Sequence, residues 1–240
     1  MADKQVKAEQ NDAAAVVAKA KGFWAAYSKK IIIAGSAVIL LLGGFLGYKY
    51  LVSIPNEKKA NDLVFPAEKL FGLIAGSSSY NKDTVNIILN GDKASGVTGL
   101  LKIASSYGGT QSGNRAEYMI GACYLQLKQF DKAIKHLKEF DANGASQVQS
   151  KAYLLLGHAY AEQKKTDDAM EYYKKAGSIS DLDEAMATEA IYMAGRYAEA
   201  MGKTKEAVEL FQELKEKYPA SQRVSSGEVD KYLGSLGGTK

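Results

Sequence analysis

The sequence predicts an all-α protein with a single N-terminal transmembrane helix, an α-solenoid of helix pairs after it, and a C-terminal capping helix. Three observations predict this fold. Ile31–Tyr48 is an uncharged apolar run of 18 residues. A glycine followed twelve residues later by an alanine recurs three times in the second half of the chain. The 240 residues include 3 prolines, which leaves room for long helices.

Composition and charge exclude several classes of function. One cysteine excludes an intrachain disulfide and Cys-based metal sites, and two histidines leave few bases or ligands. Residues 1–49 hold seven lysines and three acidic residues, so the rest of the chain, with 24 basic and 24 acidic residues, is neutral. A neutral body argues against nucleic-acid binding, whereas a basic flank beside an apolar run is typical of a membrane surface.

The first element is a membrane anchor. Residues 1–29 are predicted to form a cytoplasmic arm and a pre-membrane helix, and residues 30–53 a transmembrane helix. Eighteen helical residues span about 27 Å, which is enough to cross a hydrocarbon core. Aromatic residues flank the run on both sides, as at membrane interfaces: Phe23, Trp24, Tyr27, Tyr48 and Tyr50. The alternatives are a buried core helix and a cleaved signal peptide. The thirty preceding residues and the lack of a small-residue cleavage site favour an uncleaved span.

Lysines predict the orientation of this span. Four precede the run and three follow it: Lys19, Lys21, Lys29 and Lys30, then Lys49, Lys58 and Lys59. The excess predicts a cytoplasmic N-terminus and a repeat domain outside the cytoplasm. Gly43 and Gly47 form a G-x-x-x-G pattern, which predicts close contact with another transmembrane helix. Glycine is common in spans, so a purely lipid-facing role is the alternative.

Residues 56–110 are predicted to form a degenerate helical pair. Apolar residues recur at helical spacing over 57–78 and over 97–107, and Pro66 predicts a kink or a break in the first of these helices. Val85–Leu89 is a short apolar run between polar clusters, and we interpret it as a loop or a short strand.

Residues 111–240 are predicted to form three helix pairs and a capping helix. The pairs are marked by Gly121 with Ala133, Gly157 with Ala169, and Gly195 with Ala207, at spacings of 36 and 38 residues. A larger residue follows each alanine by four positions: Leu137, Tyr173 and Phe211. Small residues let two helix backbones approach, and the larger residues fill the seams. Because one pair cannot bury both of its faces, the pairs are expected to stack.

Polar segments separate the two helices of each pair: Lys128–Asp131, Lys164–Asp167 and Gly202–Lys205. Pro219 ends the third unit, because proline cannot continue a helix. Apolar residues spaced through 224–236 predict the helix that caps the last pair.

The pattern resembles the tetratricopeptide repeat. Tyr153, Leu156, Gly157, Tyr160, Ala169, Tyr173 and Ala176 carry the resemblance in the middle unit, and Gly195, Ala207, Phe211 and Pro219 carry it in the third. The resemblance implies a concave surface lined by the first helix of each pair. The register of the glycines places these residues there: Arg115, Tyr118, Lys151, Leu154, His158, Tyr192 and Arg196. Tyrosines and basic residues in a groove suit a peptide or protein segment. The Asn and Lys clamp for C-terminal carboxylates is missing, since Met119, Leu155 and Met193 occupy its neighbourhood.

The layout of the whole chain is similar to the ancillary subunit of the bacterial SecYEG translocon, the YfgM-like family. Lys21–Tyr50, joined directly to Glu57–Phe71, carries this resemblance. It implies a single-pass inner-membrane protein with a periplasmic repeat domain. Its partners would be SecYEG and a membrane-anchored periplasmic chaperone, and it would help emerging polypeptides reach folding factors. The alternative is a structural scaffold of another envelope machine, such as a secretion, motility or outer-membrane assembly complex.

No catalytic constellation is visible in the sequence. Cys123 is interpreted as a buried inert thiol, and His136 and His158 lie in different units without an acid–base partner. Gly91–Gly96 is followed by no Lys-Ser/Thr pair and is no phosphate loop. We therefore expect no enzyme activity, no cofactor, no metal and no small-molecule substrate.

Overall fold

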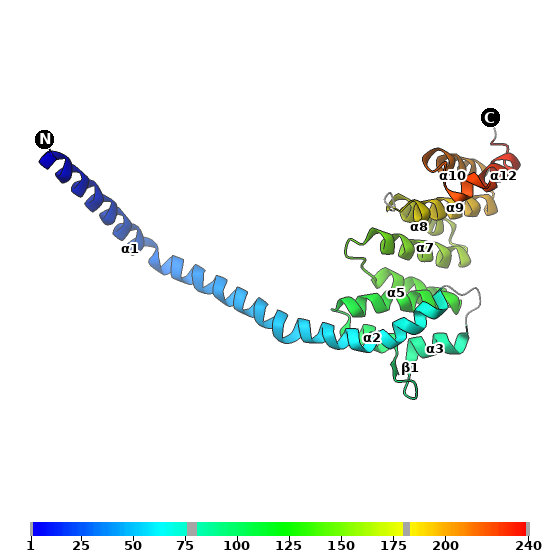
Figure 1. Cartoon of the computed structure of the whole chain (residues 1–240), viewed down its shortest axis with the longest axis horizontal. Coiled ribbons are helices and arrows are strands. Elements are labelled where there is room, and N and C mark those ends of the chain that lie inside the picture. Colours follow the sequence, from blue (N-terminus) through cyan, green and yellow to red (C-terminus); the bar gives the residue numbers. More distant parts are fainter. Residues whose placement is uncertain (1, 76–80, 180–182, 239–240) are drawn as a thin grey trace. The chain divides into compact units, whose positions relative to one another are not determined.

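A computed structural model describes residues 2–75, 81–179 and 183–238, and the chain divides into two compact units, Met1–Pro55 and Asn56–Lys240 (Figure 1). The elements are, in chain order, α1 (Ala2–Tyr48), η1 (Lys49–Ser53), α2 (Ile54–Ala75), α3 (Lys82–Asn90), β1 (Gly91–Asp92), β2 (Val97–Thr98), α4 (Leu100–Tyr107), α5 (Gln111–Gln126), α6 (Phe130–Glu139), α7 (Ser146–Glu162), α8 (Thr166–Ile179), α9 (Glu184–Ala200), α10 (Thr204–Lys217), α11 (Gln222–Ser225) and α12 (Glu228–Ser235).

The N-terminal unit is built around helix α1, which contains the apolar run 31–48. No residue of that run is buried, and Leu40, for example, is 75 % exposed. In the described part of the chain, this is the one helical stretch whose length and composition suit a membrane span. The core helix of a water-soluble domain buries its apolar side chains, so the exposure argues against the core-helix alternative. A π-helical turn, η1, follows α1 directly.

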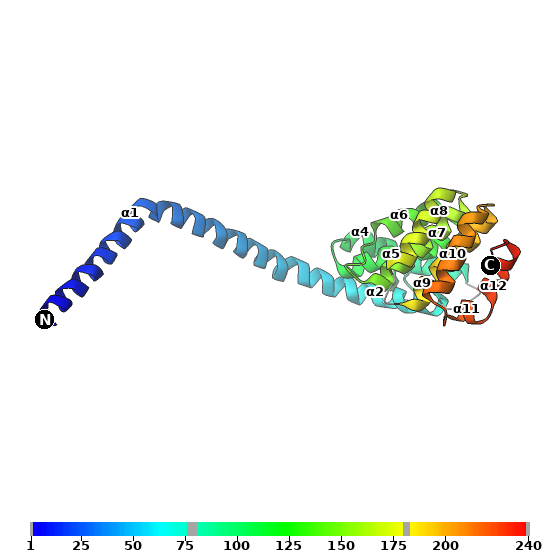
Figure 2. The ribbon, with the colours of Figure 1, turned by 90° about the horizontal axis from the view of Figure 1, so that it is seen from above.

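Three helix pairs, α5–α6, α7–α8 and α9–α10, stack in chain order in the second unit (Figures 1 and 2). Each register glycine faces the large residue predicted to fill its seam. A Cβ atom placed on Gly121 would lie 2.5 Å from Cγ of Leu137, one on Gly157 2.5 Å from Cδ1 of Tyr173, and one on Gly195 2.8 Å from Cε1 of Phe211. The alanines that mark the second helices are fully buried. The fold class and the repeat register are confirmed.

The turn inside each pair has the same geometry three times. Lys128, Lys164 and Gly202 occupy equivalent positions, with φ of 58°, 58° and 70°. In the first turn, the backbone N–H of Gln129 donates to the carbonyl of Tyr124, and the same bond recurs in the other two turns. This is the Schellman motif at the end of a helix. A residue with left-handed backbone conformation turns the chain, so that backbone N–H groups beyond the helix donate to its last carbonyls. Lysine holds a position that usually favours glycine in two of the three turns.

The segment before the repeats differs from the predicted pair. It contains three helices, α2, α3 and α4, and a two-stranded antiparallel hairpin in which Gly91 pairs with Thr98. The run Val85–Leu89 lies in helix α3, so its interpretation as a loop or strand is wrong. Asn81 caps this helix by accepting a hydrogen bond from the N–H of Asp83 at 2.8 Å, and burial of Val85, Ile88 and Leu89 stabilises it. Pro66 lies inside α2.

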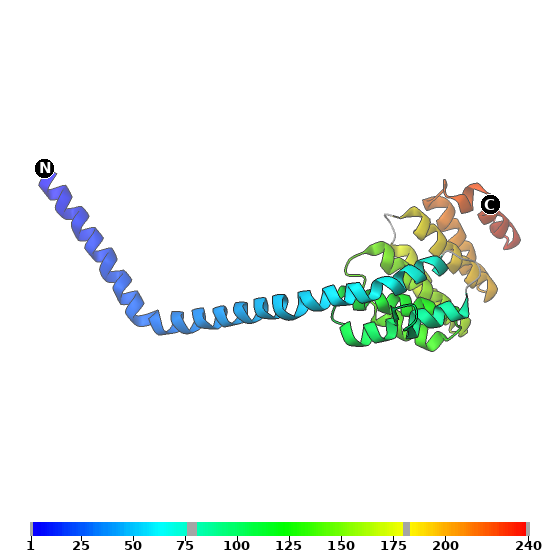
Figure 3. The same ribbon diagram turned by 60° about the horizontal axis from the view of Figure 1, so that its bottom comes forward.

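Helix α2 packs along the first helices of the stack (Figure 3). Val64 and Ala67 of α2 are fully buried and share one apolar cluster with Ala116, Met119 and Ile120 of α5. The opposite end of the stack is closed by α11 and α12, whose Val229 and Leu233 join the apolar cluster of the last two repeats. The structure therefore places a cap at the C-terminal end of the stack, as predicted from residues 224–236.

Glu57 of α2 acts as an N-terminal cap for α5. Its carboxylate accepts hydrogen bonds from the N–H of Gln111 at 2.6 Å, and from the N–H and hydroxyl of Ser112 at 3.0 and 2.7 Å. The first amides of a helix have no partner within the helix, and an anion there also meets the positive end of its dipole. Partial burial raises the pKa of Glu57, but the hydrogen bonds from Ser112 and Gln111 and the charge of Arg115 outweigh it, so the pKa is lowered.

We expect Glu57→Gln to destabilise the full-length protein by about 1 kcal/mol at pH 7, since an amide replaces a charged acceptor at a cap. The lowered pKa sets the pH dependence. The stabilisation is complete above the unfolded-state pKa of about 4.3 and disappears as the pH falls through the lower folded-state value. Thermal unfolding of the two proteins in detergent micelles between pH 7 and pH 3 measures this difference. A difference that stays constant over that range would contradict the capping role.

Candidate protein-interaction site

The N-terminal end of the concave surface is occupied by α2. Arg115 donates a hydrogen bond to Oδ1 of Asn61 at 3.0 Å, and its guanidinium lies 3.7 Å from the carboxylate of Glu68. Both partners belong to α2, and the side chains of Arg115 and Glu68 are each 44 % exposed. Arg115 is therefore accessible at the rim of the surface, with its charge partly compensated by the chain itself.

The C-terminal end of this surface is covered by α11 and α12. Tyr192 is 3 % exposed; its hydroxyl donates to Oε1 of Glu228 at 2.6 Å and accepts from Arg196 at 3.1 Å. The guanidinium of Arg196 lies 4.9 Å from the ring centre of Tyr232, and that of Arg223 lies 4.2 Å from the ring centre of Tyr192. Burial and the bond to Glu228 raise the pKa of Tyr192 to about 12. Tyr192 thus holds the cap in place, which corrects its assignment as a residue exposed to a partner.

The middle repeat contributes residues of three different kinds. Lys151 is exposed, whereas Leu154 is half-buried against the second apolar cluster. Nδ1 of His158 lies 2.9 Å from the hydroxyl of Tyr173 on α8. Burial lowers the pKa of His158, which keeps the ring neutral at pH 7. Lys151 is the member of this set that is available to a partner, and His158 ties together the two helices of its repeat.

An apolar groove lies between α2, α5 and the start of α7. Its volume is about 250 Å³, and its lining is mainly apolar: Glu68, Phe71, Gly72, Arg115, Tyr118, Met119, Phe140 and Val148. The rings of Tyr118 and Phe140 lie 5.5 Å apart. Arg115 and Tyr118 were predicted for the concave surface, but Phe71, Phe140 and Val148 were not. The sequence alone does not show that α2 lines this groove. Its groove-lining residues and its core residues recur with the same helical spacing, so the pattern does not separate the two.

Helix α2 also carries exposed apolar side chains that do not line the groove. Phe65 is 65 % exposed and Leu73 is 69 % exposed, while Val148 at the groove is 37 % exposed. Contiguous apolar surface on a folded domain marks a place where another chain or a membrane binds. Among the surfaces of the described residues, the groove is the one best suited to an apolar polypeptide segment.

Chemistry at the remaining reactive residues is limited by burial and pairing. Cys123 is fully buried, and burial raises the pKa of its thiol to about 12, so it stays protonated. Glu117, His136 and Glu139 bring three possible metal ligands within 4.8 Å of one another. Nδ1 of His136 lies 2.6 Å from the carboxylate of Glu117, so a hydrogen bond accounts for the closeness of these two side chains. Outside the repeat domain, an added Cβ at Gly43 or Gly47 of α1 would have no atom within 4 Å. Their predicted contact with another transmembrane helix stays a prediction.

Family models of known proteins agree with the repeat architecture. Family models of the tetratricopeptide repeat match residues 115–143, 150–187 and 189–221. Among solved structures, one titled "Crystal structure of MamA" is 17 % identical, covering 68 % of this chain and 88 % of that chain with a TM-score of 0.47. A second, titled "Crystal structure of MamA protein", is 15 % identical, covering 75 % of this chain and 86 % of that chain with a TM-score of 0.48. A search of curated proteins finds no match.

Proposed function

We propose that this chain, whose three tetratricopeptide repeats make it a protein-interaction scaffold, is anchored in a bacterial inner membrane beside the Sec translocon and guides emerging polypeptides to periplasmic chaperones. One observation carries the proposal. The same chain combines an apolar helix without a buried residue in the run 31–48 with a repeat domain that has an open apolar groove.

The anchor is supported by the physical properties of α1. An exposed apolar run of 18 residues is unfavourable in water and favourable in a bilayer, because each backbone amide is already bonded within the helix. In this proposal the N-terminus is cytoplasmic and the repeat domain periplasmic, and the excess of lysines before the run supports that orientation. A second helix approaching Gly43 and Gly47 would be the contact with the channel.

The groove supplies the proposed contact with emerging polypeptides. An unfolded segment exposes apolar side chains and backbone amides. It binds to a surface that can bury those side chains away from water. Phe71, Met119 and Val148 provide such a surface, while Arg115 and Glu68 at its rim offer one donor and one acceptor to a backbone. This composition favours apolar segments of varied sequence over a single defined ligand.

Copurification tests the proposal. The full-length protein, tagged and extracted in mild detergent, is expected to bring SecY and a periplasmic peptidyl-prolyl isomerase with it. Replacing 31–48 by an unrelated span should reduce this recovery. Recovery of subunits of another envelope machine, without SecY, would reject the Sec assignment while leaving the scaffold role intact.

The groove has its own test in Val148→Glu. This change places a carboxylate at the rim of the groove without removing a buried contact, and acidic residues suit the first turn of a helix. We expect crosslinking to emerging polypeptides to fall about tenfold, as apolar anchors of this kind commonly contribute 1 kcal/mol or more. Gln147→Glu adds the same charge at the neighbouring exposed position and should leave crosslinking unchanged. Equal loss in both variants would indicate general charge repulsion and not the groove.

A further inference from the structure

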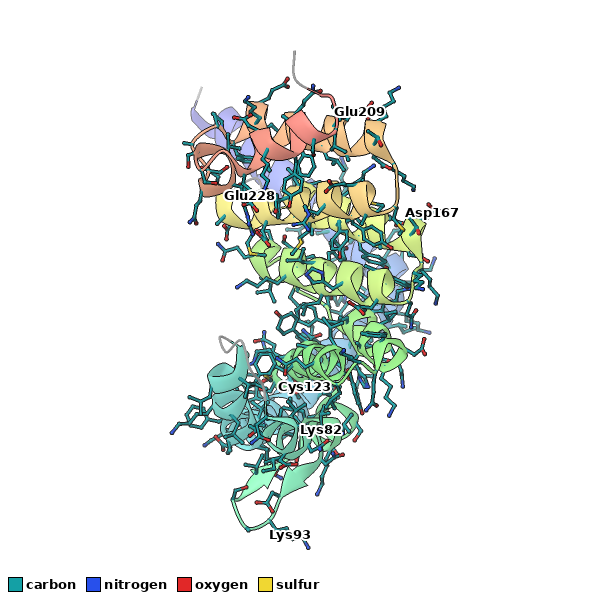
Figure 4. All side chains as sticks on the ribbon, turned by 90° about the vertical axis from the view of Figure 1, so that its right-hand side faces the viewer. Lys82, Lys93, Cys123, Asp167, Glu209 and Glu228 are labelled. Carbon is teal, nitrogen blue, oxygen red and sulfur yellow. The ribbon has the colours of Figure 1, made fainter. Side chains whose placement is uncertain are left out.

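A second pocket lies at the end of the stack that the C-terminal cap closes, opposite the hairpin that carries Lys93 (Figure 4). Its volume is about 760 Å³, and it is lined by the first turns of α9 and by the segment that contains α11 and the start of α12. This is within the size range of ligand-binding clefts. The pocket shares no lining residue with the apolar groove, and the proposed function does not use it.

The pocket has an excess of negative charge. Arg223 is paired twice, with Glu189 and with Glu228, at 2.9 Å in each case. The pair of hydrogen bonds raises the pKa of Arg223, and the bonds from Tyr192 and Arg223 lower that of Glu228, so both of these groups are charged at pH 7. The triad consists of two carboxylates and one guanidinium. The triad therefore carries one net negative charge. Glu184, also in the lining, adds a second and has no cationic partner among the residues that the structure describes.

Two buried hydroxyls of the lining lack hydrogen-bond partners. Thr188 and Ser221 are 5 % and 8 % exposed, and neither side-chain oxygen has a partner within the described residues. A buried polar group without a partner destabilises the folded state, so a pocket that retains two of them is suited to a ligand that supplies the missing bonds. Both oxygens are covered in this structure, so a ligand would reach them only after rotation about the Cα–Cβ bond turns them toward the pocket. Glu184 and Thr188 lie one helical turn apart and so share a face of α9.

We propose that this acidic pocket binds a basic segment of a polypeptide partner, with one lysine or arginine side chain entering between Glu184, Thr188 and Ser221. A cationic nitrogen with several N–H donors meets a carboxylate and two hydroxyl acceptors there. The net charge of the lining attracts it, and a concave site concentrates that field. The start of α9 contributes about half a positive charge from its dipole, which the two excess negative charges outweigh. An anionic ligand would face three carboxylates and a guanidinium that is already paired.

Peptide binding to the full-length protein in phosphatidylcholine nanodiscs tests this proposal. The probe is an acetylated, amidated peptide of glycine and serine with two central lysines, compared with versions that carry arginine, glutamine or glutamate. The lysine or arginine peptide should bind, and the stronger of the two identifies the side chain preferred. Binding should weaken as salt rises from about 0.05 to about 0.3 M, because screening shortens the range of the attraction. Equal binding of the glutamine peptide, or stronger binding of the glutamate peptide, would overturn the proposal.

Matched variants locate the site. Glu184→Gln should weaken binding of the basic peptide about fivefold to tenfold, as expected for loss of a charge-assisted contact. Glu216→Gln removes the same charge from an exposed position of α10 outside the pocket and should have no effect. Thr188→Val should weaken binding without lowering the melting temperature, since it removes an unpaired hydroxyl and keeps the shape of the side chain. Unchanged binding in Glu184→Gln would refute this site, whereas Val148→Glu, which tests the proposed function, should leave basic-peptide binding intact.

Discussion

Replacing Gly157 by leucine should destabilise the repeat domain by about 3 kcal/mol, the upper end of the usual cost of overpacking a core. A Cβ at this position would lie 2.5 and 2.6 Å from Cδ1 and Cε1 of Tyr173. That ring cannot swing aside at low cost, because it is 3 % exposed, bonds to His158 through its hydroxyl and packs edge-on against Tyr197 at 5.8 Å. Thermal unfolding of the full-length protein in detergent measures the effect, at about 2–4 °C per kcal/mol for a domain of this size.

Gly234→Leu is the control for this prediction. Gly234 lies in α12, is exposed and has nothing within 4 Å of its added Cβ. Leucine there should leave stability unchanged or raise it slightly, because glycine is the poorer helix former. If the two leucine variants unfold at the same temperature, the helices of the second pair do not cross at Gly157.

Phe211→Ala should cost about 3–5 kcal/mol, the usual range for truncating a fully buried aromatic side chain. Phe211 is fully buried on α10, where it faces Gly195 of α9 and stacks on Tyr232 of α12 at 5.1 Å. The deletion therefore loosens a repeat and its cap together. We expect a large drop in melting temperature. We also expect trypsin to cleave after the exposed Lys215, in the last turn of α10, at concentrations that leave the parent protein intact.

The same substitution at Phe65 is its control. Phe65 is 65 % exposed on α2, so Phe65→Ala should change stability by no more than about 0.5 kcal/mol. A Phe211→Ala protein as stable as Phe65→Ala would mean that the seam between α9, α10 and α12 is not packed as described.

The repeat register could be predicted from the sequence because it depends on local size. A glycine, an alanine twelve residues later and a large residue four beyond that recur in all three pairs, and close helix crossings require that combination of sizes. The structure places Leu137, Tyr173 and Phe211 opposite the three glycines. The same spacing predicts which segment forms the first helix and which forms the second helix of each pair.

The segments of the chain that cover the concave surface could not be predicted in the same way. The glycine register indicates that Tyr192 points toward this surface, but local spacing does not show that α12 packs over it. Likewise, Val85–Leu89 is too short for its periodicity to separate strand from helix, and burial of Val85 and Ile88 under neighbouring helices decides the outcome. Both cases depend on which distant segment packs against a face, and that information is not contained in the segment itself.

The cap formed by α11 and α12 has a consequence for self-association. A stack of similar helix pairs is open-ended in principle, because the last pair presents the same kind of apolar face that every earlier pair buries against its successor. Head-to-tail contacts of this kind extend into filaments wherever the rotation between copies does not close a ring. Val229, Leu233 and Tyr232 occupy the face where the next pair would begin, and the hydrogen bond from Tyr192 to Glu228 fastens them there. The cap therefore leaves no open apolar face at this end of the stack on which a second copy could continue it.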